Sequence, residues 1–134
     1  MTRSCFVPGS PAPQGSKRHV GHGRMVEMSK ALGPWRERVA LAVHGEGWPM
    51  MAGPVWVRLQ FVLPRPKSAP KRSTPPAVKR PDLDKLQRAI LDALTGIVFA
   101  DDSQVICIFA RKRIAEIDES PGVLIELDDY TEEA

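Results

Sequence analysis

The sequence contains only two cysteines, Cys5 and Cys107, and they lie far apart in the chain. Because they are far apart and neither belongs to a C-x-x-C pair, the sequence indicates neither a disulfide framework nor a zinc knuckle. No apolar run approaches the length of a membrane-spanning helix, and the first residues lack the apolar core of a signal peptide. We therefore expect a protein of the reducing cytoplasm, without membrane association and with both thiols buried.

Acidic residues are fewer than basic ones, and the 134-residue chain carries a net charge of +3. A basic surplus suggests an anionic partner such as nucleic acid, although net charge describes association and not fold. A chain of this length can bury a modest hydrophobic core by itself. We therefore expect a single domain that spans residues 1–134.

The pattern of apolar residues predicts six elements of secondary structure. Alternation predicts strands, and a period near 3.6 residues predicts helices. The predicted strands are 4–8, 55–63, 104–113 and 122–127, and the predicted helices are about 29–44 and 84–95. Their order along the chain predicts an α+β domain, with a mixed sheet of about four strands and two helices packed on it.

Two segments, about 9–27 and 64–81, are predicted to be basic loops. The second holds six prolines and six Lys or Arg residues without any acid, so we expect it to be mobile and partly extended. It is either a solvated linker or a functional surface loop, and its place inside one domain keeps the functional alternative open. The acidic residues at about 128–134 predict a frayed tail.

Aspartates occur in pairs on either side of the helix predicted at 84–95, namely Asp82 with Asp84 and Asp101 with Asp102. Taken alone, the first pair could cap the helix and the second could form a turn. A helix of about eleven residues advances roughly 17 Å, and six extended residues from Gly96 return roughly 20 Å. If the chain doubles back after Gly96, both pairs lie at the same end of the helix.

Carboxylates brought together in this way would have raised pKa values unless a cation compensated their charge. A hard divalent cation suits an all-carboxylate site, and the lack of nearby Cys or His argues against zinc. We predict that Mg²⁺, with Mn²⁺ as a substitute, binds Asp82, Asp84, Asp101 and Asp102. The neighbouring cations Lys79, Arg80, Lys85 and Arg88 suit a substrate with negative oxygens. Acids for a metal and bases for a phosphate together indicate phosphodiester hydrolysis.

The stretch "RPDLDKLQRAILDALTG", followed by "FADDSQV", resembles the signature of the RusA family of Holliday junction resolvases. The opening "GSPAPQGSKR" is similar to the N-terminal part of many phage-type members. The resemblance is dense over 79–105 and diffuse elsewhere. It implies a homodimeric α/β fold that cuts both strands of a four-way DNA junction symmetrically with Mg²⁺, without a nucleotide cofactor. The host process would be recombination, repair or phage DNA processing.

The resemblance also implies which residues act in catalysis. The family's essential carboxylates fall on Asp82, Asp84 and Asp102. Better-studied members have Asn where this chain has Lys85, and a functionally important Lys where it has Arg88. Arg88 keeps the charge but does not readily give up a proton, so proton transfer would fall to Lys85 or to water. Both residues are therefore catalytic candidates.

The basic loops and the end of the strand at 104–113 supply the predicted DNA contacts. These are Lys17, Arg18, Lys67, Lys71, Arg72, Lys79, Arg80 and Lys112. The alternative function is a non-catalytic protein that binds branched DNA, in which the acids are caps and the loops grip the backbone. The departures at Lys85 and Arg88 favour this alternative, and metal-dependent cleavage would exclude it.

Overall fold

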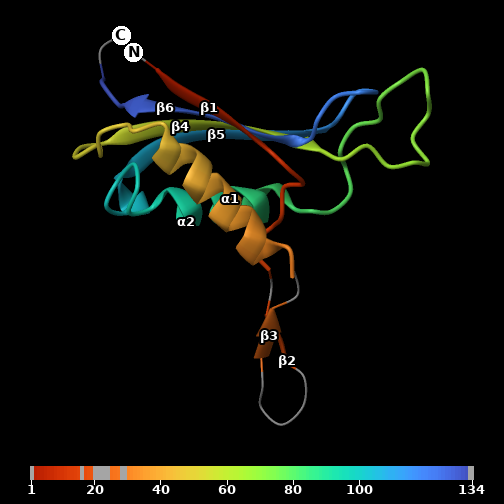
Figure 1. Ribbon diagram of the computed structural model, residues 1–134, viewed down its shortest axis with the longest axis horizontal. Helices are drawn as coiled ribbons and strands as arrows, with labels where there is room; N and C mark the ends of the chain where they lie inside the picture. Colours follow the sequence, from red (N-terminus) through yellow and green to blue (C-terminus); the bar gives the residue numbers. More distant parts are fainter. Residues whose placement is uncertain (1, 16, 20–24, 28–29, 133–134) are drawn as a thin grey trace.

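The computed structural model describes residues 2–15, 17–19, 25–27 and 30–132, with the backbone alone for 17–19 and 25–27. A four-stranded mixed sheet has the order β1-β6-β4-β5, and two helices pack on one of its faces (Figure 1). The elements of this domain are β1 (Arg3–Pro8), α1 (Leu32–Gly45), β4 (Val55–Leu63), α2 (Leu83–Leu94), β5 (Val105–Ile114) and β6 (Gly122–Asp129). Strand β4 pairs in parallel with β5 and antiparallel with β6. The predicted α+β architecture is confirmed.

The core lies between the sheet and the two helices. Three alternate residues of β4, Val57, Leu59 and Phe61, are at most 1% exposed. They face the apolar stripe of α2, which includes the fully buried Leu86 and Ile90. Burying a large apolar side chain stabilises the fold by roughly 1.5–3 kcal/mol. Neither helix of the described part of the chain is long and apolar enough to cross a membrane.

The segment predicted as a basic loop at 9–27 contains a small hairpin. Strands β2 (Lys17–His19) and β3 (Met25–Glu27) pair antiparallel, with Lys17 opposite Glu27. The prediction of a continuous loop is therefore wrong for these residues. Residues 16, 20–24 and 28–29 lie outside the described residues.

Two further predictions need correction. The acidic tail begins later than predicted, because Asp128 and Asp129 belong to β6 and Asp128 lies 3.0 Å from the guanidinium of Arg3. Residues 133 and 134 lie outside the described part of the chain. Cys5 is buried as expected, and its burial raises the pKa of its thiol to about 11, but Cys107 is exposed. Cys107 points outward because its strand alternates and its other face packs on the helices.

The loop 64–81 has no helix or strand, as predicted, but it is organised around one guanidinium. Arg65 donates to the hydroxyl of Thr74 (2.8 Å) and to the backbone carbonyls of Pro70, Ser73 (2.6 Å) and Ala115 (3.1 Å). The Thr74 hydroxyl in turn donates to the carboxylate of Glu116. These bonds fold the loop toward the turn between β5 and β6, where the sequence predicted an extended segment.

A close backbone contact between β1 and β6 gives the first prediction. A Cβ atom added at Gly122 would lie 2.4 Å from the carbonyl oxygen of Val7 and 2.6 Å from Cζ of Phe6. Because strand β1 would have to shift, we expect Gly122→Ala to lower the free energy of unfolding by about 1–3 kcal/mol. At Gly53 nothing lies within 4 Å of such an atom, so Gly53→Ala is the matched control. Equal losses of unfolding free energy for Gly122→Ala and Gly53→Ala in urea denaturation would contradict this explanation.

Candidate active site

Asp82 begins helix α2 without capping it. It is the N-cap residue, with an extended backbone, but its side chain makes no capping hydrogen bond. The carboxylate is 52% exposed and lies 4.0 Å from the ammonium of Lys85. Asp84 lies in the first turn of the helix and is not its N-cap residue. The structure therefore does not support the alternative in which Asp82 and Asp84 serve only as helix caps.

Asp84 lines an open cleft of about 440 Å³ together with Gln14, Gly15, Lys85, Gln87 and Arg88. The backbone N–H of Gln14 donates to the carbonyl oxygen of Lys85 (2.9 Å) and fixes the N-terminal segment on α2. The side-chain oxygen of Gln14 is buried and has no hydrogen-bond partner. A buried acceptor in this state is unfavourable unless a donor or a cation reaches it. Sequence reasoning missed Gln14, for which its place in "GSPAPQGSKR" was the only signal.

The chain doubles back after α2, as predicted. Gly96 has a φ of +86°, which favours glycine, and its N–H donates to the carbonyl oxygen of Phe99 (2.7 Å). The return ends beside the middle of α2, where a carboxylate oxygen of Asp102 lies 3.0 Å from the guanidinium of Arg88. That both acid pairs share the start of the helix stays a prediction, and the contact that the structure shows is between Asp102 and Arg88, one turn after Asp84.

Gln104 holds the turn that carries the second acid pair. Its side-chain oxygen accepts from the N–H groups of Ala100 and Asp101, and its side-chain nitrogen donates to the carbonyls of Met51 and Gly53. The carboxylate of Asp101 accepts from the N–H of Ser103 (2.9 Å), and this hydrogen bond lowers the pKa of Asp101. Asp101 therefore has the plain role of a cap, which weakens its prediction as a metal ligand. The residues "DDSQ" therefore form a turn that hydrogen bonds hold in one place on the domain.

Arg88 is the positive group among the acids. Its guanidinium lies 3.0 Å from a carboxylate oxygen of Asp102 and 3.8 Å from one of Asp92. Ion pairs at a surface contribute only about 0–1 kcal/mol each, so an anionic substrate can compete for this guanidinium.

The oxygen donors at α2 fit a hard divalent cation. The structure places no three His, Cys, Asp or Glu side chains together as a metal site within the residues it describes, so the four predicted ligands do not form one cluster. However, Mg²⁺ keeps several waters and is usually held by one or two carboxylates plus substrate oxygens. Asp84 and Gln14 line one cleft, and Asp84 lies two residues after Asp82. This all-oxygen set suits Mg²⁺ or Mn²⁺ better than zinc.

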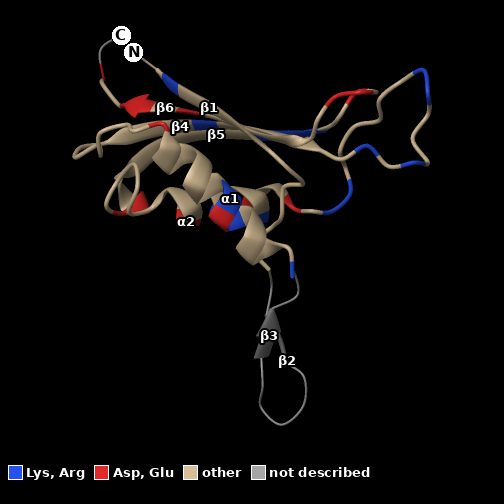
Figure 2. Cartoon of the chain, in the orientation of Figure 1, with Lys and Arg blue, Asp and Glu red and all other residues tan. Residues whose placement is uncertain are grey.

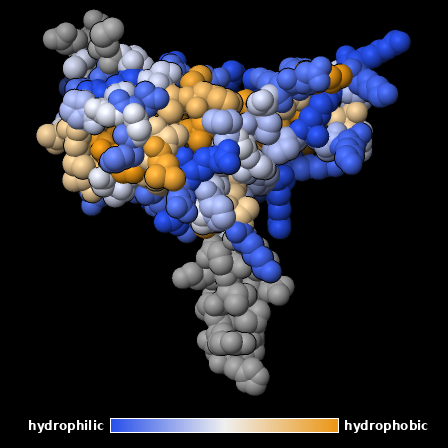
Figure 3. Space-filling view, viewed as in Figure 1, coloured by the Kyte–Doolittle hydropathy of each residue, from blue (hydrophilic) through white to orange (hydrophobic). Residues whose placement is uncertain are grey.

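The predicted DNA contacts divide into three groups. Five of them, Lys67, Lys71, Arg72, Lys79 and Arg80, are exposed on the loop 64–81, which projects from the domain as a basic arm (Figures 2 and 3). Lys112 instead donates to the backbone carbonyls of Lys79 (2.8 Å) and Pro81 (2.7 Å), so it holds the loop. Lys17 and Arg18 lie in β2, and their side chains fall outside the described residues.

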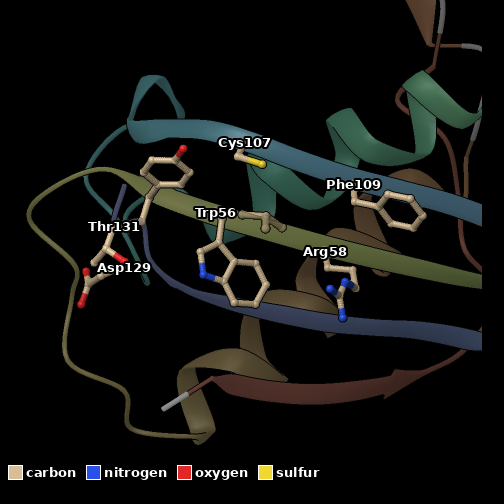
Figure 4. A pocket seen from close by; sticks show the side chains of 8 residues that line it. Trp56, Arg58, Cys107, Phe109, Asp129 and Thr131 are labelled. Carbon is tan, nitrogen blue, oxygen red and sulfur yellow. The ribbon is translucent and has the colours of Figure 1, made fainter. Parts of the chain in front are cut away.

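A second candidate surface lies on the face of the sheet away from the helices. It has a cavity of about 290 Å³ lined by Trp56, Arg58 and Phe109, among others (Figure 4). The guanidinium of Arg58 lies 5.9 Å from the centre of the Trp56 ring and 3.8 Å from the carboxylate of Glu126. Because acidic residues, including Asp129, compensate its charge, this cavity suits phosphate less well than the cleft at Asp84.

One known protein family matches most of the chain. The family model described as Endodeoxyribonuclease RusA matches residues 8–128. The matched range covers most of the chain and includes both acid pairs, the cleft at Asp84 and the basic loop. No curated protein matches the chain.

Proposed function

Because the chain belongs to the RusA family of endodeoxyribonucleases, we propose that it is a Mg²⁺-dependent enzyme that resolves Holliday junctions and other branched DNA by paired cleavage. One observation carries the proposal. Two exposed carboxylates, Asp82 and Asp84, stand at the start of a helix beside an open cleft, with Lys85 in the same turn and Arg88 in the next. The setting would be recombination, repair or phage DNA processing in the cytoplasm of a bacterial or phage-infected cell.

In the proposed mechanism, Asp82 and Asp84 hold the cation, and Asp102 is the third essential carboxylate. A divalent cation bound there would supply Lewis-acid stabilisation of the attacked phosphodiester. Lys85 and Arg88 lie three residues apart on one helix face, so both can bind the non-bridging oxygens of one phosphate. Asp102 orients the guanidinium of Arg88. Because Arg88 stays charged, proton transfer falls to Lys85 or to water.

We propose that the active form is a homodimer with two-fold symmetry. A four-way junction is itself nearly two-fold symmetric, and its resolution needs two related cuts. A dimer in which both subunits use the same surface supplies two matched sites.

The alternative is an accessory protein that binds branched DNA without cutting it. The observation that favours it is the position of Arg88, which pairs with Asp102 where the nuclease mechanism needs a catalytic carboxylate. The absence of a cluster of three metal-ligating side chains in the described ranges points the same way.

A cleavage assay on a synthetic mobile four-way junction separates the two functions. We expect paired, symmetric nicks with Mg²⁺ or Mn²⁺, none after chelation by EDTA, and little product from a linear duplex of the same sequence. Salt-sensitive binding of the junction, without product at any concentration of either metal, would establish the accessory function instead.

A further inference from the structure

A cavity of about 610 Å³ lies between the loop 64–81 and the body of the domain, directly before Asp82 in the chain. It is separate from the cleft at Asp84 and is larger. Apolar groups form most of its wall, including Leu63, Pro66, Ala69, Pro76, Ala77 and Ile114. Lys79 and Arg80 also line it, and both are exposed, whereas no acidic residue does.

Hydrogen bonds hold both sides of this cavity in place. On the loop side, Arg65 binds three backbone carbonyls and the hydroxyl of Thr74. On the other side, Lys112 reaches from β5 to the backbone carbonyls on either side of Arg80. The cavity is therefore part of the folded domain, and its basic rim has a fixed place relative to Asp82.

The chemistry of the lining identifies the occupant. Proline rings and aliphatic side chains make flat apolar walls, which suit an aromatic heterocycle, and a cavity of this volume is in the range of ligand pockets. The two cations that line the cavity, Lys79 and Arg80, suit negative charge next to that heterocycle. A nucleobase with its two flanking phosphates satisfies both demands, and an apolar peptide satisfies only the first.

We infer that this cavity receives an unstacked nucleobase of the DNA strand, next to the phosphodiester that is cut, while Lys79 and Arg80 bind the adjacent phosphates. The inference rests on the proposed nuclease function and adds to it a site that holds, and can select, a base beside the cut. Bases at a branch point have weakened stacking, which lowers the free energy needed to extrude one. Val78 lines the cavity and is 80% exposed, so it is placed to act as the apolar wedge that separates two bases.

The test uses 2-aminopurine, a base analogue whose fluorescence rises when it unstacks, at single positions around the mapped cut in a four-way junction. With Ca²⁺ in place of Mg²⁺ to prevent cleavage, we expect an increase of at least about twofold at one position adjacent to the cut. The variant Ala77→Leu fills the cavity and is expected to abolish this increase, with the junction dissociation constant changed less than about threefold because phosphate contacts dominate affinity. The same change at Ala52, which is exposed and does not line the cavity, is the control.

Two results would overturn the inference. The first is that the protein binds and cuts the junction although 2-aminopurine shows no fluorescence increase at any position next to the cut. The second is that the fluorescence increase persists in Ala77→Leu. If Ala77→Leu fails to fold, Ala69→Leu fills the cavity from the loop side and is judged by the same criterion. A wild-type protein that binds the junction but never cuts it would overturn the proposed nuclease, whereas a fluorescence increase at the branch point of that complex, abolished by Ala77→Leu, would still establish the base pocket.

Discussion

Asp84→Asn is expected to lower the rate of junction cleavage by at least about 100-fold while the protein still binds the junction. The carboxamide keeps the size of the carboxylate but loses its charge, so it binds a hard divalent cation much more weakly. Because a negative charge that faces phosphate is removed, the affinity for DNA should be unchanged or higher. Single-turnover cleavage measures the first effect, and an electrophoretic mobility shift without metal measures the second.

A matched pair of aspartates tests whether a carboxylate acts in catalysis or only through its charge. Asp102 and Asp92 both contact the guanidinium of Arg88, and both side chains are 29% exposed. We expect Asp102→Asn to lower the rate by about 100-fold and Asp92→Asn by less than about fivefold. Equal losses would remove Asp102 from the proposed site, and full cleavage by Asp84→Asn would remove the mechanism itself.

Strong periodicity made parts of the fold predictable. The alternation of five apolar residues over 55–63 gives the bounds of β4 as observed, and the apolar stripe at 84–95 gives α2 to within one residue. The strands β2 and β3 have three residues each, which is too short for a periodic signal. The sequence predicts Asp128 to be part of an acidic tail because the residues that Asp128 contacts are distant in sequence. These are Trp56, which is opposite Asp128 in the sheet, and Arg3.

The site was predictable in its residue types but not in its distances. The length of the segment after Gly96 sets how far the chain can return, and this segment includes Phe99, which is fully buried in the core. Gln104 then fixes the turn through carbonyls of the 51–53 segment, which no local pattern could reveal. As a result Asp102 meets Arg88, and the cation among the acids in this structure is a guanidinium.

Phe99→Ala is expected to lower the free energy of unfolding by about 3–5 kcal/mol, because it leaves a cavity in the core. Phe99 is fully buried, it bridges to Met51, and its carbonyl accepts from Gly96. The same residue ends the return segment two positions before Asp101, so its loss should also release the acidic turn from α2. Urea denaturation measures the stability, and hydrogen exchange at the N–H of Gln104, which donates to Asp101, measures the turn.

Phe109→Ala provides the control for this prediction. Phe109 is 57% exposed on the outer face of the sheet, so the same truncation there should change the free energy of unfolding by less than about 1 kcal/mol. If both variants lost similar stability, the core would not be centred between the sheet and the helices. If Phe99→Ala lost stability but kept full protection at Gln104, the turn that carries Asp102 would be held by Gln104 alone, and the link between core packing and the catalytic acids would be wrong.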